Sequence, residues 1–331
     1  KVTVTIKENS VNETYDGTEK TVTGYKVKSI SNNLYKTEDF TFKGNATVTA
    51  KDAGSYDMDV KAKDFANISN NFTDVTFIVE DGQLVIERRK VTLTSANDEK
   101  PYDGTALTND TVTVGGDGFA SGEGATYDVT GSQTVVGKSD NNFTYKLNAG
   151  TDDNNYDIEQ KTGTLEVIPN ATEVIVKIAG HTGGEKYNGT AQKVTGYDVD
   201  INNPLYTEDD FEFTGNAVVE ETDAGTYNMG LAEKNFKNIS KNFSNVRFEV
   251  TDGALTIAKR DLTLTAGSKE KVYDGNALTD DTVNVSGDGF AQGDQGTYEV
   301  TGSQTWVGQS DNEITKVEIK SGKKNVKDNY N

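Results

Sequence analysis

The chain of 331 residues contains no cysteine, one histidine and one tryptophan. Without cysteine it can form no disulfide bond. The only histidine, His181, aligns with Asn9 in the internal repeat described below. Histidine-dependent nucleophiles and histidine zinc sites are therefore nearly excluded. We expect His181 to be a solvated loop residue.

Long apolar runs and an excess of basic residues are also missing. No stretch approaches the roughly 18 apolar residues that a membrane helix requires, so no membrane span is expected. There are 53 acidic and 33 basic residues, a net charge of −20. That charge repels phosphate backbones and anionic membrane surfaces, so nucleic acid is not an expected partner. The start, "KVTVTIKE", lacks the features of a signal peptide and is expected to lie inside a longer protein.

The sequence is rich instead in alternating apolar and polar residues. Val2, Val4 and Ile6 alternate with threonine and lysine, a pattern typical of strands with one buried face. Threonine, valine and tyrosine are plentiful, and Asp-Gly and Gly-Asp pairs mark turns. No long stretch has a helical period, although "LAEKNF" at 231–236 could form one helical turn. The chain is therefore predicted to be all-β.

Four copies of a Tyr-Asp/Asn-Gly corner, beginning at Tyr15, Tyr102, Tyr187 and Tyr273, divide the chain into an A-B-A-B array. We name the predicted repeats A1, B1, A2 and B2; they comprise residues 1–88, 89–169, 170–259 and 260–331. The junctions between them are short and contain no Gly/Ser run. Such junctions favour an elongated, semi-rigid rod in which each repeat contacts its neighbours.

Several motifs of this array resemble the tandem YDG/MBG-type repeats of large bacterial cell-surface, adhesin-like proteins. They are the Tyr-Asp-Gly-Thr corner, "GDGF" (116–119 and 287–290), "VTGSQT" in both B repeats, and "NY" leading to "GTLEV" (155–156 and 163–167). The B repeats fit this resemblance better than the A repeats do. The resemblance implies an extracellular stalk associated with a bacterial cell wall, and it names no ligand.

The corner permits two interpretations. Glycine after Asp or Asn supplies the positive φ that tight turns need. The tyrosine before the turn can bury its ring and tie its hydroxyl to nearby backbone. The favoured interpretation is therefore an architectural corner that pins the first strand onto the sheet. The alternative is an exposed aromatic ring for stacking on glycans.

A second signature favours a sandwich. "DAGSYDM" (52–58) and "DAGTYNM" (223–229) resemble the tyrosine corner of immunoglobulin-like domains, with Met58 and Met229 as core filling in place of cysteine. The expected fold is therefore four tandem, small β-sandwich (immunoglobulin-like) domains. A β-grasp-like repeat with one short helix is the competing fold. Trp306 aligns with Val135 in the other B repeat and is interpreted as a packing residue.

No catalytic and no cofactor-binding residues are identified, and the chain is not expected to be an enzyme. "GSQTVVGKS" (131–139) misses the spacing of a phosphate loop and is followed by a strand. Carboxylates are abundant, but four small repeats are a poor scaffold for a single catalytic cleft.

A calcium site is an open alternative. Oxygen-rich loops between repeats could bind Ca²⁺ and stiffen a rod, although plain turns have the same composition. The residues concerned are Asp117, Asp140, Asn141, Asp152, Asp153, Asn154, Asp288, Asp311 and Asn312.

We find no convincing set of residues for a self-formed Lys–Asn isopeptide bond. Lys63 and Asn67 in A1, like Lys234 and Asn238 in A2, are too close in sequence for a link across a sheet. The lysines that precede the B corners are Lys100 and Lys271.

The leading hypothesis is a stalk or spacer region of a bacterial cell-surface adhesin that presents a distal domain away from the wall. One rival is an adhesion module that binds a host or environmental glycan, mucin or protein. Its exposed aromatics would be Tyr35, Tyr206, Phe65 and Phe236. Another rival is a subunit of a surface filament.

The fourth repeat is expected to lack its last strand. B2 ends just after Asn329-Tyr330, which aligns with Asn155-Tyr156, so it has no counterpart of "GTLEVI". Without this strand, one edge of the sheet would be left unpaired. We expect the native chain to continue with that strand, or another molecule to supply one.

Overall fold

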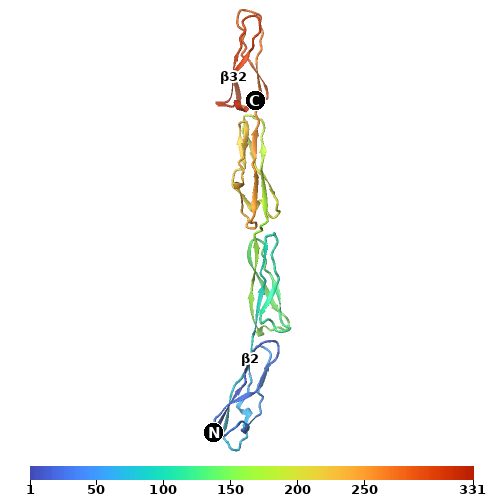
Figure 1. Ribbon diagram of the computed structural model, residues 1–331, viewed down its shortest axis with the longest axis vertical. Helices are drawn as coiled ribbons and strands as arrows, with labels where there is room; N and C mark the ends of the chain where they lie inside the picture. Colours follow the sequence, from blue (N-terminus) through green and yellow to red (C-terminus); the bar gives the residue numbers. More distant parts are fainter. The chain divides into compact units, whose positions relative to one another are not determined.

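The computed structural model describes residues 1–331, which form strands joined by turns and one-turn 3-10 helices (Figure 1). The all-β prediction is confirmed. The helical turn expected within 231–236 is η5 (Glu233–Asn235). None of the helical turns is long and apolar enough to cross a membrane. The chain divides into two compact units, Lys1–Ile168 and Pro169–Asn331.

The A1 half of the first unit is built from two three-stranded sheets and two smaller strand pairs. The sheets have the orders β4-β1-β9 and β2-β10-β7, and the pairs are β3-β6 and β5-β8. Within the sheets, β1 runs parallel to β9 and β2 runs parallel to β10. The elements are β1 (Val2–Glu8), β2 (Val11–Thr14), β3 (Lys20–Thr23), β4 (Tyr25–Ile30), η1 (Thr37–Asp39), β5 (Phe40–Phe42), β6 (Thr47–Ala50), β7 (Gly54–Asp57), η2 (Ala62–Asp64), β8 (Phe65–Asn67), β9 (Val75–Glu80) and β10 (Gln83–Glu87).

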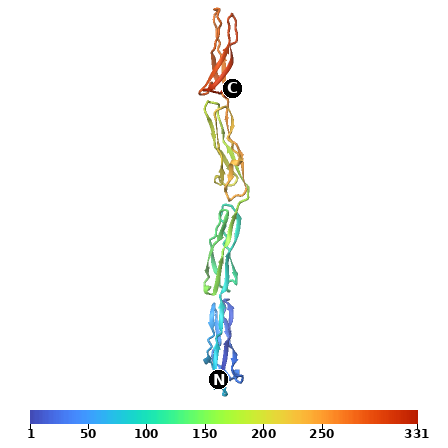
Figure 2. The same ribbon diagram turned by 90° about the vertical axis from the view of Figure 1, so that its left-hand side faces the viewer.

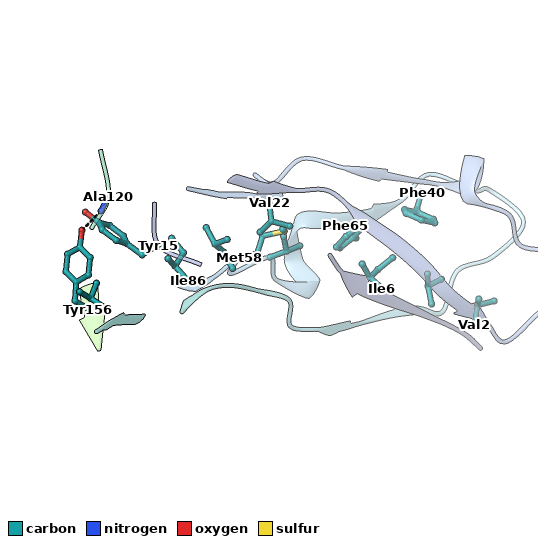
Figure 3. Packing of buried hydrophobic residues seen from close by; sticks show 14 of the residues in the cluster. Val2, Ile6, Tyr15, Val22, Phe40, Met58, Phe65, Ile86, Ala120 and Tyr156 are labelled. Atoms are coloured by element: carbon teal, nitrogen blue, oxygen red, sulfur yellow. Dashed lines mark hydrogen bonds between the residues drawn. The ribbon is translucent and has the colours of Figure 1, made fainter. Parts of the chain in front are cut away.

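Both three-stranded sheets of A1 contribute to one core. Val2, Val4 and Ile6 of β1 are fully buried, and so is Leu84 of β10. These side chains belong to one continuous apolar cluster, of which Figure 3 labels Val2 and Ile6. Burial of alternate side chains from two sheets is the packing of a sandwich, and it follows from the alternation in the sequence.

The B1 half repeats this plan with different strand lengths. Its sheets have the orders β13-β11-β17 and β12-β18-β15, with the pair β14-β16 beside them. Again the first strand, β11, runs parallel to β17, and β12 runs parallel to β18. The elements are β11 (Arg89–Ser95), β12 (Asp98–Pro101), β13 (Val112–Gly116), β14 (Ala125–Val129), β15 (Gly137–Asn141), β16 (Phe143–Leu147), η3 (Asp153–Asn155), β17 (Tyr156–Lys161) and β18 (Gly163–Ile168).

The A2 half of the second unit has the sheet orders of A1. They are β22-β19-β27 and β20-β28-β25, with the pairs β21-β24 and β23-β26. Within each unit the strands run along the long axis of that unit, as the side view in Figure 2 shows. The elements are β19 (Val174–Gly180), β20 (Thr182–Gly183), β21 (Gln192–Thr195), β22 (Tyr197–Ile201), η4 (Glu208–Asp210), β23 (Phe211–Phe213), β24 (Val218–Glu221), β25 (Gly225–Asn228), η5, β26 (Phe236–Asn238), β27 (Val246–Thr251) and β28 (Ala254–Ile257).

The B2 half contains fewer strands than B1. Its sheets are β29-β30 and β31-β32-β33. No strand occupies the places that β17 and β18 take in B1, and residues 267–276 form no strand where B1 has β12. The elements are β29 (Leu262–Ala266), β30 (Val283–Gly287), β31 (Asp294–Thr301), β32 (Glu313–Ser321), β33 (Lys324–Asn325) and η6 (Lys327–Asn329).

The four corners share one backbone turn. In A1 the carboxylate of Asp16 accepts the backbone N–H of Thr18 at 2.9 Å, and the equivalent bond is present in every repeat. The glycine that follows has positive φ each time, so this prediction is confirmed. The glycines are Gly17 (82°), Gly104 (79°), Gly189 (83°) and Gly275 (84°).

The A repeats also contain the second expected signature. The hydroxyl of Tyr56 donates to the carbonyl of Asp52 at 2.9 Å, four residues upstream, as a tyrosine corner does. The A2 copy makes the same bond between Tyr227 and Asp223. The methionine that follows each tyrosine is buried, as expected for core filling.

Candidate functional site: the joint between repeats A and B

The corner tyrosine of A1 lies at the junction with B1. Tyr15 is 2% exposed, and its ring meets the ring of Tyr156 edge-on with centroids 5.6 Å apart (Figure 3). Its hydroxyl donates to Glu123 at 2.6 Å. The expectation that this hydroxyl ties back to nearby backbone is therefore wrong, because its acceptor is a carboxylate of the next repeat.

Glu123 binds two tyrosines at once. One carboxylate oxygen accepts from Tyr15, and the other accepts from the hydroxyl of Tyr156 at 2.7 Å. That second hydroxyl also accepts the backbone N–H of Ala120 at 3.0 Å. Hydrogen bonds to an ionised acceptor are about twice as strong as neutral ones. The carboxylate therefore clamps a residue of A1 to a residue of B1.

The surroundings keep both tyrosines protonated. Burial, with the Glu123 carboxylate, raises the pKa of Tyr156 to about 12. The same two causes hold the pKa of Tyr15 well above its usual value. At neutral pH each hydroxyl is therefore a donor, as the clamp requires.

A buried asparagine forms the second contact between the repeats. Asn155 is 1% exposed. Its side-chain oxygen accepts the backbone N–H of Ala53 at 2.7 Å, and its amide donates to the carboxylate of Asp52 at 3.1 Å. The Asp-Ala-Gly motif of A1 is thus joined to the Asn-Tyr motif of B1.

An arginine completes the joint. The guanidinium of Arg89 donates to three backbone carbonyls, those of Gly118 (2.7 Å), Asp117 (2.5 Å) and Tyr15 (3.3 Å). The planar arginine fork fixes direction as well as distance, which a lysine could not do. Arg89 therefore ties the corner of A1 to the "GDGF" turn of B1.

The second unit builds the same joint between A2 and B2. Tyr187 meets Tyr330 with centroids 5.6 Å apart. Tyr330 donates to Asp294 at 2.6 Å and accepts the N–H of Ala291 at 2.8 Å. Burial, with Asp294, raises the pKa of Tyr187 to about 12.

The polar contacts of the first joint are also repeated. Asn329 accepts the N–H of Ala224 at 2.6 Å and donates to Asp223 at 3.0 Å. Arg260 donates to the carbonyls of Gly289, Asp288 and Tyr187. The second joint therefore repeats the first, with Asp294 in the place of Glu123.

The aromatics expected at a glycan site are not exposed. Tyr35 and Tyr206 are 1% and 2% exposed, and Phe65 and Phe236 are equally part of the buried core. Tyr35 donates to Asn67 at 2.9 Å, and that asparagine also binds the backbone of Phe72. The glycan-site prediction is wrong for these residues, because they form the aromatic interior of the A repeats.

The acidic loop residues do not converge. No group of three or more His, Cys, Asp or Glu side chains in residues 1–331 could hold a metal ion. Asp288 pairs with Lys186 at 2.8 Å in the A2–B2 joint, and Asp152 caps η3. Asn141 and Asn312 hold loops through bonds to backbone carbonyls.

His181 lies at the surface, as expected. Its Nδ1 is 2.8 Å from the carbonyl of Thr195, and its Nε2 is 3.2 Å from Asp198. The hydrogen bond to Asp198, with that to Thr195, raises the pKa of the imidazole. Asn9 makes the equivalent contact in A1, to the carbonyl of Thr23.

The single tryptophan packs on an aromatic neighbour at the surface. Trp306 is 73% exposed and stacks on Tyr273, which is itself 53% exposed. Tyr273 is the corner tyrosine of B2. It therefore differs in burial from the corner tyrosines of A1 and A2.

Sequence reasoning missed the residues on the B side of the joint. Glu123 and Asp294, and Arg89 and Arg260, received no role, although each recurs at the same place in both B repeats. The available signal was a charged residue of the same sign at the same position in both B repeats. The partner of Glu123 lies 108 residues away in sequence, so no local pattern could identify it.

The fold and the joint define a class of protein: a tandem array of small all-β repeats linked by a duplicated contact. The model of the MBG domain family matches residues 2–88 and 171–259, more than half of the chain, and the chain belongs to that family. The matched regions are A1 and A2; the B repeats, which fitted the resemblance better, lie outside them. A search of curated proteins found no match.

Proposed function

We propose that the chain is a non-enzymatic stalk segment of an extracellular bacterial surface protein. Its role is to hold a distal domain away from the cell wall to which the protein is anchored. The observation that carries the proposal is the duplicated joint, in which the same corner tyrosine, carboxylate, asparagine and arginine recur in both units. A catalytic group is needed once, whereas a joint is needed at every junction.

The chemistry of the joint suits a spacer. Arg89 and Arg260 bind backbone carbonyls, and Tyr15 donates to a carboxylate of the next repeat, so each contact depends on the geometry of the neighbouring repeat. Such nearest-neighbour contacts transmit orientation along a repeat array. The net charge of −20 limits non-specific association with other acidic surfaces.

Small-angle X-ray scattering of residues 1–331 tests the proposal. A compact chain of this length has a radius of gyration of about 20 Å, and a stalk requires a value well above that. A measured value near the compact one would overturn the proposal.

A pair of variants tests whether the joints set the stiffness. Arg89→Ala with Arg260→Ala should broaden the distribution of interatomic distances, because both joints lose the hydrogen bonds from the guanidinium to backbone carbonyls. Arg247→Ala is the matched control, since Arg247 pairs only with Glu173 and Glu249 on the surface. Equal scattering from both variants would show that the arginines do not hold the repeats in place.

A further inference from the structure

The corner of A2 differs chemically from the other three corners. Residue 188 is asparagine, whereas the same position holds a carboxylate at Asp16, Asp103 and Asp274. Asn188 with Gly189 is the only Asn-Gly pair in the chain. Asparagine is among the chemically labile residues, and a following glycine leaves its backbone nitrogen uncrowded because it has no side chain.

The corner asparagine also lacks the ion pair that the corner aspartates make. In A1, Asp16 pairs with Lys20, and both B corners pair with a lysine in the same way. The residue of A2 that aligns with Lys20 is Gln192. Its side chain accepts the backbone N–H of Glu185 at 2.8 Å. A lysine nearby favours the carboxylate anion, which is a poor electrophile, whereas Asn188 offers a neutral carboxamide.

The turn holds the reacting atoms of Asn188 and Gly189 together. Oδ1 of Asn188 accepts the backbone N–H of Thr190 at 2.9 Å. This bond closes a ring that contains both the side-chain carbon Cγ and the backbone nitrogen of Gly189. The hydroxyl of Thr190 donates to the same Oδ1 at 2.7 Å. Two donors on the oxygen that gains negative charge stabilise attack at Cγ, as in an oxyanion hole.

The attacking nitrogen and the leaving group are both free of other contacts. The N–H of Gly189 and the Nδ2 amide group of Asn188 donate to no group of the chain. Both residues are half-buried and Thr190 is exposed, so water reaches the turn. No hydrogen bond within the chain has to break before the nitrogen attacks or ammonia leaves.

We propose that Asn188 is a site of spontaneous deamidation, and that its isoaspartate product disrupts the joint between A2 and B2. The backbone nitrogen of Gly189 gives its proton to water and bonds to Cγ. The Cγ–Nδ2 bond breaks, and ammonia leaves with a proton taken from water. A water molecule then opens the succinimide and restores the N–H. Opening at Cγ gives aspartate, and opening at the α-carbonyl carbon gives isoaspartate, whose main chain runs through the former side chain.

The joint has no room for a longer main chain at this position. Gly189 packs so closely on B2 that an added Cβ would lie 2.4 Å from the carbonyl oxygen of Gln292. An isoaspartyl linkage inserts one more carbon directly after Tyr187, which is 1% exposed. The ring of Tyr187 should therefore lose its contact with Tyr330. The aspartate product only restores the residue of the other corners, so it should leave the joint intact.

The experiment ages the chain of residues 1–331 for several weeks at neutral pH and body temperature. Peptide mapping by mass spectrometry locates each asparagine that has gained about one dalton, and an isoaspartate-specific methyltransferase labels the branched product. We expect Asn188 to convert at least about tenfold faster than Asn148, because the turn activates its carboxamide. Asn148 is an exposed asparagine that precedes alanine.

Two variants make the test specific. Thr190→Val removes the hydroxyl donor and keeps the shape of the side chain. Conversion should then slow by about tenfold, less than the roughly hundredfold that such a donor gives in a water-excluded site. Asn188→Asp carries the charge of the product on a normal main chain. Its amide exchange at 187–190 and 289–293 should match that of the fresh chain, whereas the aged chain should exchange faster there as isoaspartate accumulates.

Three results would overturn the proposal. They are conversion of Asn188 no faster than that of Asn148, equal rates in Thr190→Val and the unchanged chain, and unchanged exchange at 289–293 in a chain that contains isoaspartate. The A1–B1 joint is the internal control, because Asp16 stands at its corner and its exchange should stay constant as the chain ages. None of these measurements depends on whether the chain is elongated.

Discussion

The carboxylate of Glu8 accepts the backbone N–H of Gly82 through a 2.7 Å hydrogen bond inside A1. Its other oxygen accepts the N–H of Val60, also at 2.7 Å. Glu8 is 1% exposed, and the A2 counterpart is Gly180. There Asp252 takes over by accepting the N–H of Leu231 at 2.8 Å. The two A repeats thus satisfy the equivalent amide, that of Val60 or Leu231, with carboxylates from different positions in the sequence.

Replacing Glu8 by alanine should therefore destabilise A1. The change leaves two buried amides without acceptors, and we expect a loss of about 1–3 kcal/mol in the free energy of unfolding. Hydrogen exchange resolved by repeat measures this loss. Glu19→Ala is the control, since Glu19 is exposed. An equal effect of both substitutions would contradict the assigned role of Glu8.

Replacing Gly54 or Gly225 by valine should destabilise the respective A repeat by about 1–3 kcal/mol. The reason is the tyrosine two residues on, because an added Cβ would lie 3.2 Å from the Tyr56 hydroxyl and 3.0 Å from the Tyr227 ring. Backbone strain is not the cause, since neither glycine has positive φ.

Gly115→Ala is the matched control for these glycine variants. An added Cβ there meets nothing nearer than 3.7 Å, so stability should change little. Hydrogen exchange should show the loss in the substituted repeat and a smaller one in its neighbour. A uniform loss along the chain would count against repeats that unfold separately.

The joints should weaken at alkaline pH. The pKa values of Tyr156 and Tyr187 are raised from 10.0 to about 12. A raised pKa means that the folded chain binds the proton more tightly than the unfolded chain does. The stabilisation is therefore complete below pH 10 and is lost as the pH rises through about 12.

Urea denaturation at pH 9 and pH 11.5 measures this alkaline loss. The expected slope is at most about 1.4 kcal/mol per pH unit for each tyrosine. Tyr156→Phe with Tyr187→Phe should flatten the slope, because phenylalanine has no proton to lose. A slope that persists unchanged in the double variant would refute the assignment.

His181 should contribute to stability in acid rather than in base. Its pKa is raised, so its contribution is complete below the ordinary value of 6.5 and is lost as the pH rises through the folded-state pKa. His181→Asn introduces the residue that A1 has at the same place. The variant should unfold with the same midpoint at pH 8 but should lack the gain near pH 6.

The sequence predicted the elements whose causes are local. Alternation placed Val2, Val4 and Ile6 in the core, and the Asp-Gly pairs required positive φ at residues such as Gly17. The role of Tyr15 was not predictable from its surroundings, because its ring and hydroxyl bind residues of the next repeat. Tyr35 and Phe65 were assigned to the surface in one hypothesis, yet a sheet this small needs its aromatics to fill the interior.

The parallel pairing of β1 with β9 and of β2 with β10 has a mechanical consequence. In a parallel pair, the start of the earlier strand and the end of the later one lie at opposite ends of the ladder. Tension on the two ends of A1 would therefore slide the strands along each other, loading the hydrogen bonds from Val2↔Val75 to Lys7↔Glu80 together. Antiparallel strands pulled apart at one end would break one bond at a time. The pairing recurs in B1 and A2, so each of these repeats resists stretching as a whole.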